Sequence, residues 1–220
     1  MSGATATGFQ RVDTDYSDVN AMTFCVEQAL ARVRTAHPVV VKAVTNAGSV
    51  AAVGYVDVQP MVNQIDGLGN PTPHGIIHNI PYSRLQGGAN AVIMDPVVGD
   101  LGVLLMADRD ISAVKNTKAP ANPGSFRRFD FSDGMYVAAH LNAAPTQYVQ
   151  FNAGGITISS PTAITLTVGA ASLTLTASGL SMTGVPITSD SDATFNEVSV
   201  HNHVHAGVAS GSASTDPPTT

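Results

Sequence analysis

Charged side chains, cysteine and tryptophan are scarce in this chain of 220 residues. Charged residues make up 12% of it, roughly half the share found in ordinary soluble domains. Few side chains are therefore available for acid–base or phosphate chemistry. The single Cys25 excludes an intrachain disulfide framework, and its apolar, helix-like surroundings predict a buried, inert thiol.

Basic residues are missing from the second part of the chain. All ten Lys and Arg residues lie at or before Arg128 and are balanced there by ten acids, whereas the remaining 92 residues hold six acids, the whole net charge of −6. This distribution excludes the basic patch of a nucleic-acid-binding protein, so no specific nucleic-acid partner is expected. No signal peptide and no run of ~20 apolar residues is found, and we expect synthesis in the cytoplasm.

Hydrophobic residues nevertheless reach 44%, enough for a folded protein. Residues 1–37 are predicted to form an N-terminal arm followed by a helix. The helix is predicted from Asp18 to Arg34, with Ser17 or Asp18 as its N-cap, because apolar residues recur at three- and four-residue spacing. These residues are Met22, Val26, Ala29, Leu30 and Val33.

Residues 38–112 are predicted to be a small β-barrel. About five short strands beside one helix are typical of a closed barrel such as an OB-fold. Without a basic face or stacking aromatics, a structural barrel is favoured over an oligonucleotide-binding one. Residues 113–150, with Pro120, Pro123 and Gly124, are predicted to be a connector. The expected strands lie at 39–41, 50–53, 55–58, 61–62, 76–77, 91–94 and 102–106.

Residues 151–200 repeat a unit of one short strand and one turn, with Ile, Leu and Val alternating with Thr and Ser. Successive aliphatic positions are 8, 9, 7 and 7 residues apart, at Ile156, Ile164, Leu173, Leu180 and Ile187. A strand this short shields only one face, so one chain cannot bury its aliphatic side. Three chains around a common axis can, and they leave no strand edge unpaired. The pattern therefore predicts a homotrimeric, triple-stranded, intertwined β-helix.

Three histidines at two-residue spacing, His201, His203 and His205, lie in the final segment, residues 201–220. Side chains two apart on a strand face the same way, so two histidines per chain place six imidazoles on the axis of a trimer. Six-fold octahedral coordination suits Fe or Ni better than tetrahedral Zn. A turn near Asn202 would direct His203 and His205 inward and leave His201 as an accessory ligand. The alternative is an exposed His-rich tail with adventitious metal affinity.

The segment His203-Val204-His205-Ala206-Gly207-Val208, followed by Gly211, Thr215 and Pro217, resembles the tip motif of the central spike proteins of contractile phage tails. This baseplate-assembly spike family has an N-terminal OB-fold and a C-terminal trimeric β-helix. The resemblance implies one iron ion per trimer, held octahedrally by six histidines from His203 and His205. It also implies a location at the tip of the tail baseplate in the virion, contact with hub and tail-tube proteins, and piercing of the host outer membrane.

The expected fold is therefore mainly β, with a barrel, a trimeric needle and a metal-bound tip, and no enzymatic activity is expected. One alternative is a trimeric receptor-binding fibre or tailspike, which needs a groove with clustered aromatics or carboxylates. Phe195 is the only aromatic residue among the last 69, which disfavours that alternative. A cell-wall hydrolase needs two placed carboxylates or an open metal site. Asp190, Asp192 and Glu197 are instead expected to be solvated turn residues.

Overall fold

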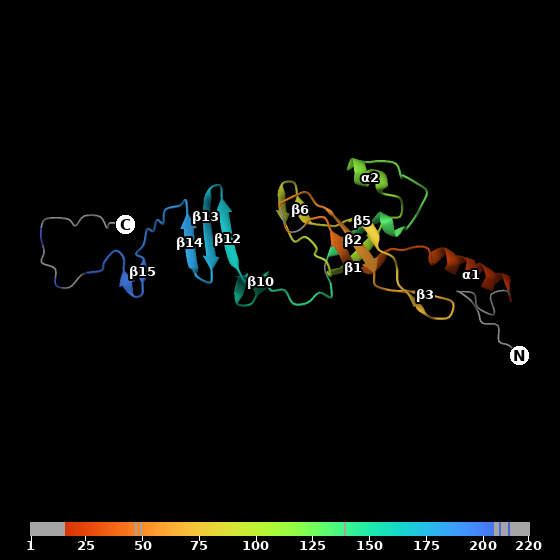
Figure 1. Cartoon of the computed structure of the whole chain (residues 1–220), viewed down its shortest axis with the longest axis horizontal. Helices are drawn as coiled ribbons and strands as arrows, with labels where there is room; N and C mark the ends of the chain where they lie inside the picture. The colour runs from red at the N-terminus through yellow and green to blue at the C-terminus, as the bar shows by residue number, and fades with distance from the viewer. Residues whose placement is uncertain are drawn as a thin grey trace. The chain divides into compact units, whose positions relative to one another are not determined.

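A computed structural model describes residues 16–46, 48, 50–138, 140–204, 207 and 211. The chain is mainly β, as expected from its sequence. It divides into two compact units, Met1–Ala144 and Pro145–Thr220. The first unit contains a five-stranded sheet and the second contains smaller antiparallel sheets (Figure 1).

Helix α1 spans Asp18–Leu30 and begins where the sequence predicts. The Ser17 hydroxyl caps it by accepting a hydrogen bond from the backbone N–H of Asn20. Regular helix ends four residues before the expected Arg34, although the N–H of Val33 still bonds to the carbonyl of Leu30. No residue of α1 is buried. Cys25 is exposed, so the prediction of a buried thiol is wrong for the single chain.

The first unit is built on five antiparallel strands in the order β5-β2-β1-β8-β9. They are β1 (Ala36–Val44), β2 (Tyr55–Pro60), β5 (Ile77–Pro81), β8 (Leu101–Met106) and β9 (Gly134–Ala138). A parallel bridge between Tyr82 and Tyr136 joins the two outer strands of this order. The backbone N–H of Ser83 also donates to the carbonyl of Tyr136 at 2.9 Å.

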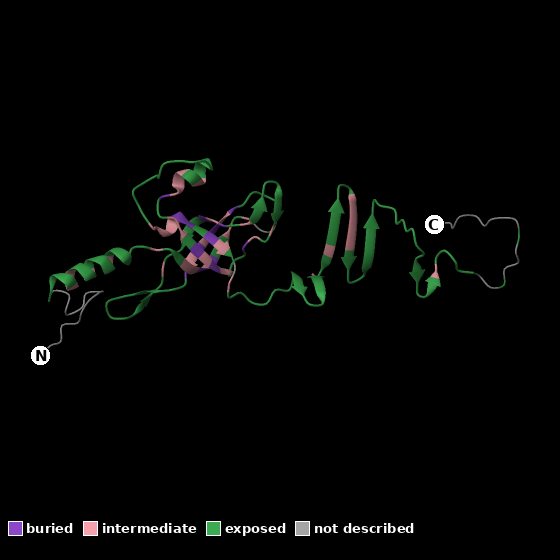
Figure 2. Ribbon diagram, turned by 180° about the vertical axis from the view of Figure 1, so that it is seen from behind, coloured by how far each residue is buried: buried purple, intermediate pink, exposed green. Residues whose placement is uncertain are grey.

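The core of this unit lies on one face of these strands. Val39 and Val41 on β1, and Val56 and Val58 on β2, are two residues apart and so point to the same side. Figure 2 shows that the buried residues gather in this sheet. The complete hydrophobic core among the described residues is Val39, Val41, Val56, Val58, Ile80, Tyr82, Leu104 and Tyr136.

Smaller elements surround the sheet: the hairpins β3 (Gln64–Ile65) with β4 (Pro71–Thr72) and β6 (Leu85–Gly87) with β7 (Asn90–Val92), helix α2 (Ser112–Thr117) and the 3-10 turn η1 (Phe131–Asp133). Two sequence expectations differ from this arrangement. Segments 50–53 and 61–62 form no strands. Strand β9 lies within the expected connector 113–150 and pairs with β8, so the sheet extends beyond residue 112.

The second unit contains strands at the expected repeats. They are β10 (Tyr148–Asn152), β11 (Gly155–Ser159), β12 (Ala163–Val168), β13 (Ala171–Thr176), β14 (Gly179–Thr183), β15 (Thr194–Phe195) and β16 (Val198–Ser199). Strands β12, β13 and β14 lie side by side as an antiparallel sheet (Figure 1). β10 pairs with β11, and β15 pairs with β16. Gly169, with φ of 58°, occupies the hairpin turn between β12 and β13, where L-residues are strained.

Candidate functional site

The β12–β13–β14 sheet has two chemically different faces. Leu173 lies opposite Leu166 on one side and Met182 on the other. Because cross-strand partners and residues two apart share a face, the register collects the large apolar side chains on one side, which we call the aliphatic face. It consists of Ile164, Leu166, Val168, Leu173, Leu175, Leu180 and Met182.

The aliphatic face is largely open in the single chain. Leu166 is 61% exposed, Val168 82% and Leu180 61%. None of the described residues from 145 onward is buried (Figure 2). Covering one such side chain completely contributes about 1.5–3 kcal/mol. A contiguous exposed apolar surface of this kind marks an interaction site.

Apart from Ala163 and Gly179 at strand ends, the opposite face bears only hydroxyl side chains, and we call it the hydroxyl face. It consists of Thr165, Thr167, Ser172, Thr174, Thr176, Ser181 and Thr183. The hydroxyls of Thr165 and Thr174, which are cross-strand partners, lie 3.3 Å apart. This face offers no charged group or aromatic ring for catalysis or for stacking on a ligand.

The pairing of β10 with β11 repeats this segregation. Val149 lies opposite Ile158, and Phe151 lies opposite Ile156. The alternate positions pair Gln150 with Thr157. Ile156 is 67% exposed and Phe151 is 75% exposed. Two separate sheets of the unit thus leave an aliphatic or aromatic side uncovered in one chain.

The histidine segment follows the β15–β16 hairpin, in which Phe195 pairs with Val198. The chain then turns at residues 200–202, which agrees with the turn predicted near Asn202. The backbone N–H of Asn202 donates to the Ser199 hydroxyl at 2.7 Å. The backbone N–H of His201 donates to Asp192 at 2.9 Å. Hydrogen bonds from the side chain of Ser199 and from this N–H lower the pKa of Asp192.

His203 lies directly after this turn. Its Nδ1 is 3.0 Å from the carbonyl oxygen of Ser199 and 3.1 Å from that of Val200. Carbonyl oxygens only accept hydrogen bonds, so Nδ1 is the donor in these contacts. Histidine ligands of metals usually donate their second ring N–H in this way. The contact therefore fits a metal-binding role for His203.

Of the other two histidines of the motif, the structure describes only His201. His201 is exposed and contacts Asp192 through its backbone. His205 lies outside the described residues. Within the described part of a single chain, no three His, Cys, Asp or Glu side chains are grouped as a metal site.

A charged cluster in the first unit was not found from the sequence. Asp133 is fully buried and accepts hydrogen bonds from Arg127 Nε at 2.7 Å and from the backbone N–H of Ile111 at 3.0 Å. Arg127 also lies 3.1 Å from Asp110, which accepts a hydrogen bond from the Ser125 hydroxyl. These contacts fasten the loop at 120–130 to the sheet unit. The proximity comes from the fold, since Arg127 and Asp110 are far apart in sequence.

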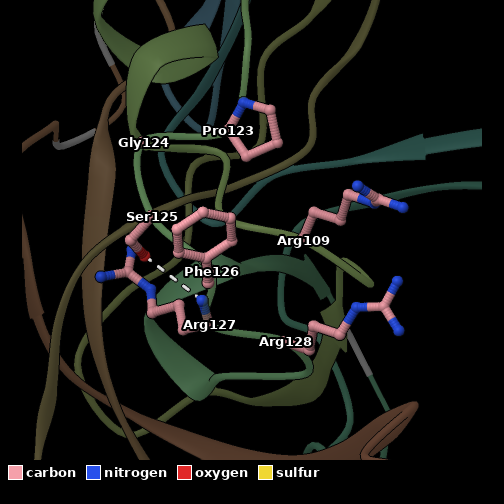
Figure 3. A pocket seen from close by; sticks show the side chains of 7 residues that line it. All are labelled: Arg109, Pro123, Gly124, Ser125, Phe126, Arg127 and Arg128. Atoms are coloured by element: carbon pink, nitrogen blue, oxygen red, sulfur yellow. Dashed lines mark hydrogen bonds between the residues drawn. The ribbon is translucent and has the colours of Figure 1, made fainter.

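A pocket adjoins this loop. Arg109, Phe126 and Arg128 are among the residues that line it, and the backbone N–H of Arg127 donates to Ser125 (Figure 3). Phe126 is fully exposed. The pocket brings together no acid–base pair of the kind that hydrolysis requires.

Comparison with known proteins gives no assignment. No family model matches the chain, and a search of curated proteins finds no match. Among the helices of the described residues, none combines the length and the hydrophobicity needed to traverse a bilayer.

Proposed function

We propose that this chain is the central spike of a contractile phage tail, a homotrimer that pierces the host outer membrane when the sheath contracts and that catalyses no reaction. The observation that carries the proposal is the uncovered aliphatic face of β12–β14, which is backed by a hydroxyl face and followed by the histidine motif.

Three copies sharing one interior account for the two faces. The aliphatic faces meet around the common axis, and the hydroxyl faces form the outside of a triangular, triple-stranded β-helix. Neighbouring chains then supply partners for outer strands such as β12 and β14, which would otherwise invite aggregation. The smooth Thr and Ser exterior suits a rigid needle better than a receptor-binding surface.

The first unit is the part that seats the needle on the hub and tube proteins of the baseplate. Its pairing order, closed by the Tyr82–Tyr136 bridge, supports an OB-fold barrel, which is a five-stranded Greek-key arrangement. Its fully buried core of Val, Ile, Leu and Tyr side chains makes it a stable mount. Polar bonds such as those of Arg127 keep the adjoining loop in place.

The metal belongs at the tip, where strand pairing ends and the needle is most easily frayed. His203 and His205 of three chains would hold one iron ion there, with His201 as an accessory ligand. The bound ion would cross-link the chains, because ligation of a structural metal adds to folding free energy. The Nδ1 contacts of His203 support this assignment, since histidine ligands of metals usually donate a hydrogen bond from their second ring nitrogen.

The mechanism is mechanical. Sheath contraction drives the tail tube toward the host, and the force falls on a narrow point. The needle must resist buckling, which the shared aliphatic interior provides, and its end must resist splaying, which the histidines provide. In the virion the protein is thus located at the tip of the tail baseplate.

Elemental analysis together with the solution mass of purified protein tests this proposal. We expect a trimer with one metal ion per three chains. The double variant His203→Ala, His205→Ala should remain trimeric and lose the stoichiometric metal, whereas the control His140→Ala should keep it. A monomeric wild-type protein, or an unchanged metal content in the double variant, would contradict the proposal.

A further inference from the structure

Helix α1 leaves its whole apolar side uncovered. Val19 is 72% exposed, Met22 69%, Val26 52% and Leu30 62%, and Val33, which lies just beyond the helix, is 43% exposed. The helix has 13 residues, and isolated helices shorter than ~12–15 residues are marginal in water. Such a helix gains most of its stability by burying its apolar face. Something therefore covers this face when the protein is assembled.

We infer that α1 covers this face with its own copies, as a parallel three-helix coiled coil in the trimer. The apolar positions follow the three–four alternation of a heptad seam, the spacing that lets identical helices pack knobs into holes. With Val19 at position a, the seam within α1 consists of Val19, Met22, Val26 and Ala29, and Val33 is the next position of the same register beyond the helix. This inference rests on the trimer of the proposed function.

Residues beside the seam also favour self-association. Like charges at these flanking positions would meet in an assembly of identical helices and oppose it. Thr23, Cys25 and Leu30 are uncharged, and the charged Asp18 and Arg32 flank the seam only near its ends. Leu30, beside the seam, widens the apolar stripe. A stripe wider than the two seam positions suits a bundle of more than two helices better than a pair.

The size of the face explains why the helices need the rest of the trimer. The five apolar side chains on this side of the helix bury roughly 300–500 Å² of surface per chain when they are covered. Stable interfaces bury ~800 Å² per partner. Chains already joined elsewhere meet at an effective concentration in the millimolar range, which compensates for this small area. The coiled coil thus forms only because other parts of the trimer already hold the three chains together.

Cys25 makes this contact measurable in the full-length protein. It is the only cysteine and it is exposed, so a nitroxide label attaches at one position in each chain without any substitution. Helices in a bundle lie ~8–10 Å apart, and the label arms extend that separation. We expect double electron–electron resonance to show a narrow distribution of about 20 Å between labels.

A seam variant and its control complete the test. Met22→Glu combined with Val26→Glu should keep the trimeric mass in light scattering and lose the short distances. Gln28→Glu adds a charge away from the seam and should keep them. A trimer whose wild-type labels lie far apart, or whose seam variant keeps the short distances, overturns the coiled coil alone. A monomeric mass overturns the proposed function itself, and the coiled coil with it.

Discussion

The aliphatic face gives a test in which a single chain and a trimer predict different stabilities. Leu166 is 61% exposed in one chain, so Leu166→Ala in a monomer should change the free energy of unfolding by no more than about 0.5 kcal/mol. If three chains bury Leu166, the same change removes three carbons from a packed interior. Such substitutions lower stability by ~2–5 kcal/mol per site.

The trimer contains this site three times, so the total loss is about 6–15 kcal/mol per trimer. Thr167, the next residue but on the hydroxyl face, provides the matched control. Thr167→Ala removes a similar number of atoms from the outside and should change stability by no more than about 0.5 kcal/mol per chain.

Guanidinium unfolding followed by circular dichroism, at two protein concentrations, measures both effects. Unfolding coupled to dissociation should have a midpoint that rises with concentration, and Leu166→Ala should shift that midpoint far more than Thr167→Ala does. Equal, small shifts in the two variants, with no dependence on concentration, would refute a shared interior.

Two predictions concern the first unit. Arg127→Met should destabilise it by about 2 kcal/mol, because it leaves the buried Asp133 without its charged partner, whereas Arg128→Met should change thermal stability little. This estimate is below the value for a fully buried pair, because the Arg127 side chain is 39% exposed. Hydrogen bonds from Ser112 and Ser125, with nearby Arg127, lower the pKa of Asp110 from 3.8 to about 2. Because the folded-state pKa is lowered, this stabilisation is present above pH 3.8 and is lost as the pH falls toward 2. Asp110→Asn should therefore flatten the decline in melting temperature across that range, and an undiminished decline would count against this assignment.

The spacing of apolar residues along the sequence was sufficient to predict helix α1 and strands β11 to β14. The three- and four-residue spacing placed α1 with its Ser17 cap. The alternation of aliphatic and hydroxyl residues placed β11, β12, β13 and β14. In these segments the apolar residues recur at the spacing of a helix or of a strand, so the spacing alone predicts the type of element and its apolar face.

The remaining differences between expectation and structure come from contacts between residues far apart in the sequence. Strand β9 is short and follows a polar segment, and the apolar run Met135-Tyr136-Val137 is its only local indication. Tyr136 nevertheless belongs to the core and bridges to Tyr82. Conversely, residues 50–53 begin and end with the β-branched Val50 and Val53, but Val50 is 96% exposed and the segment pairs with no strand of the sheet. β-propensity describes fit to a half-buried surface and cannot create one.

The histidine motif depends both on residue spacing, which the sequence shows, and on a contact that only the folded chain shows. The two-residue spacing singled out His203 and His205, and parity required a turn before His203. The structure contains that turn, and it adds the contact of His203 Nδ1 with the carbonyl oxygen of Ser199, which no sequence period could indicate. In the proposed tip, such a contact would orient the ring of His203 before it bound a metal. Loss of this contact would weaken the site without removing a ligand, so the turn at residues 200–202 is as much a part of the proposed tip as the imidazoles are.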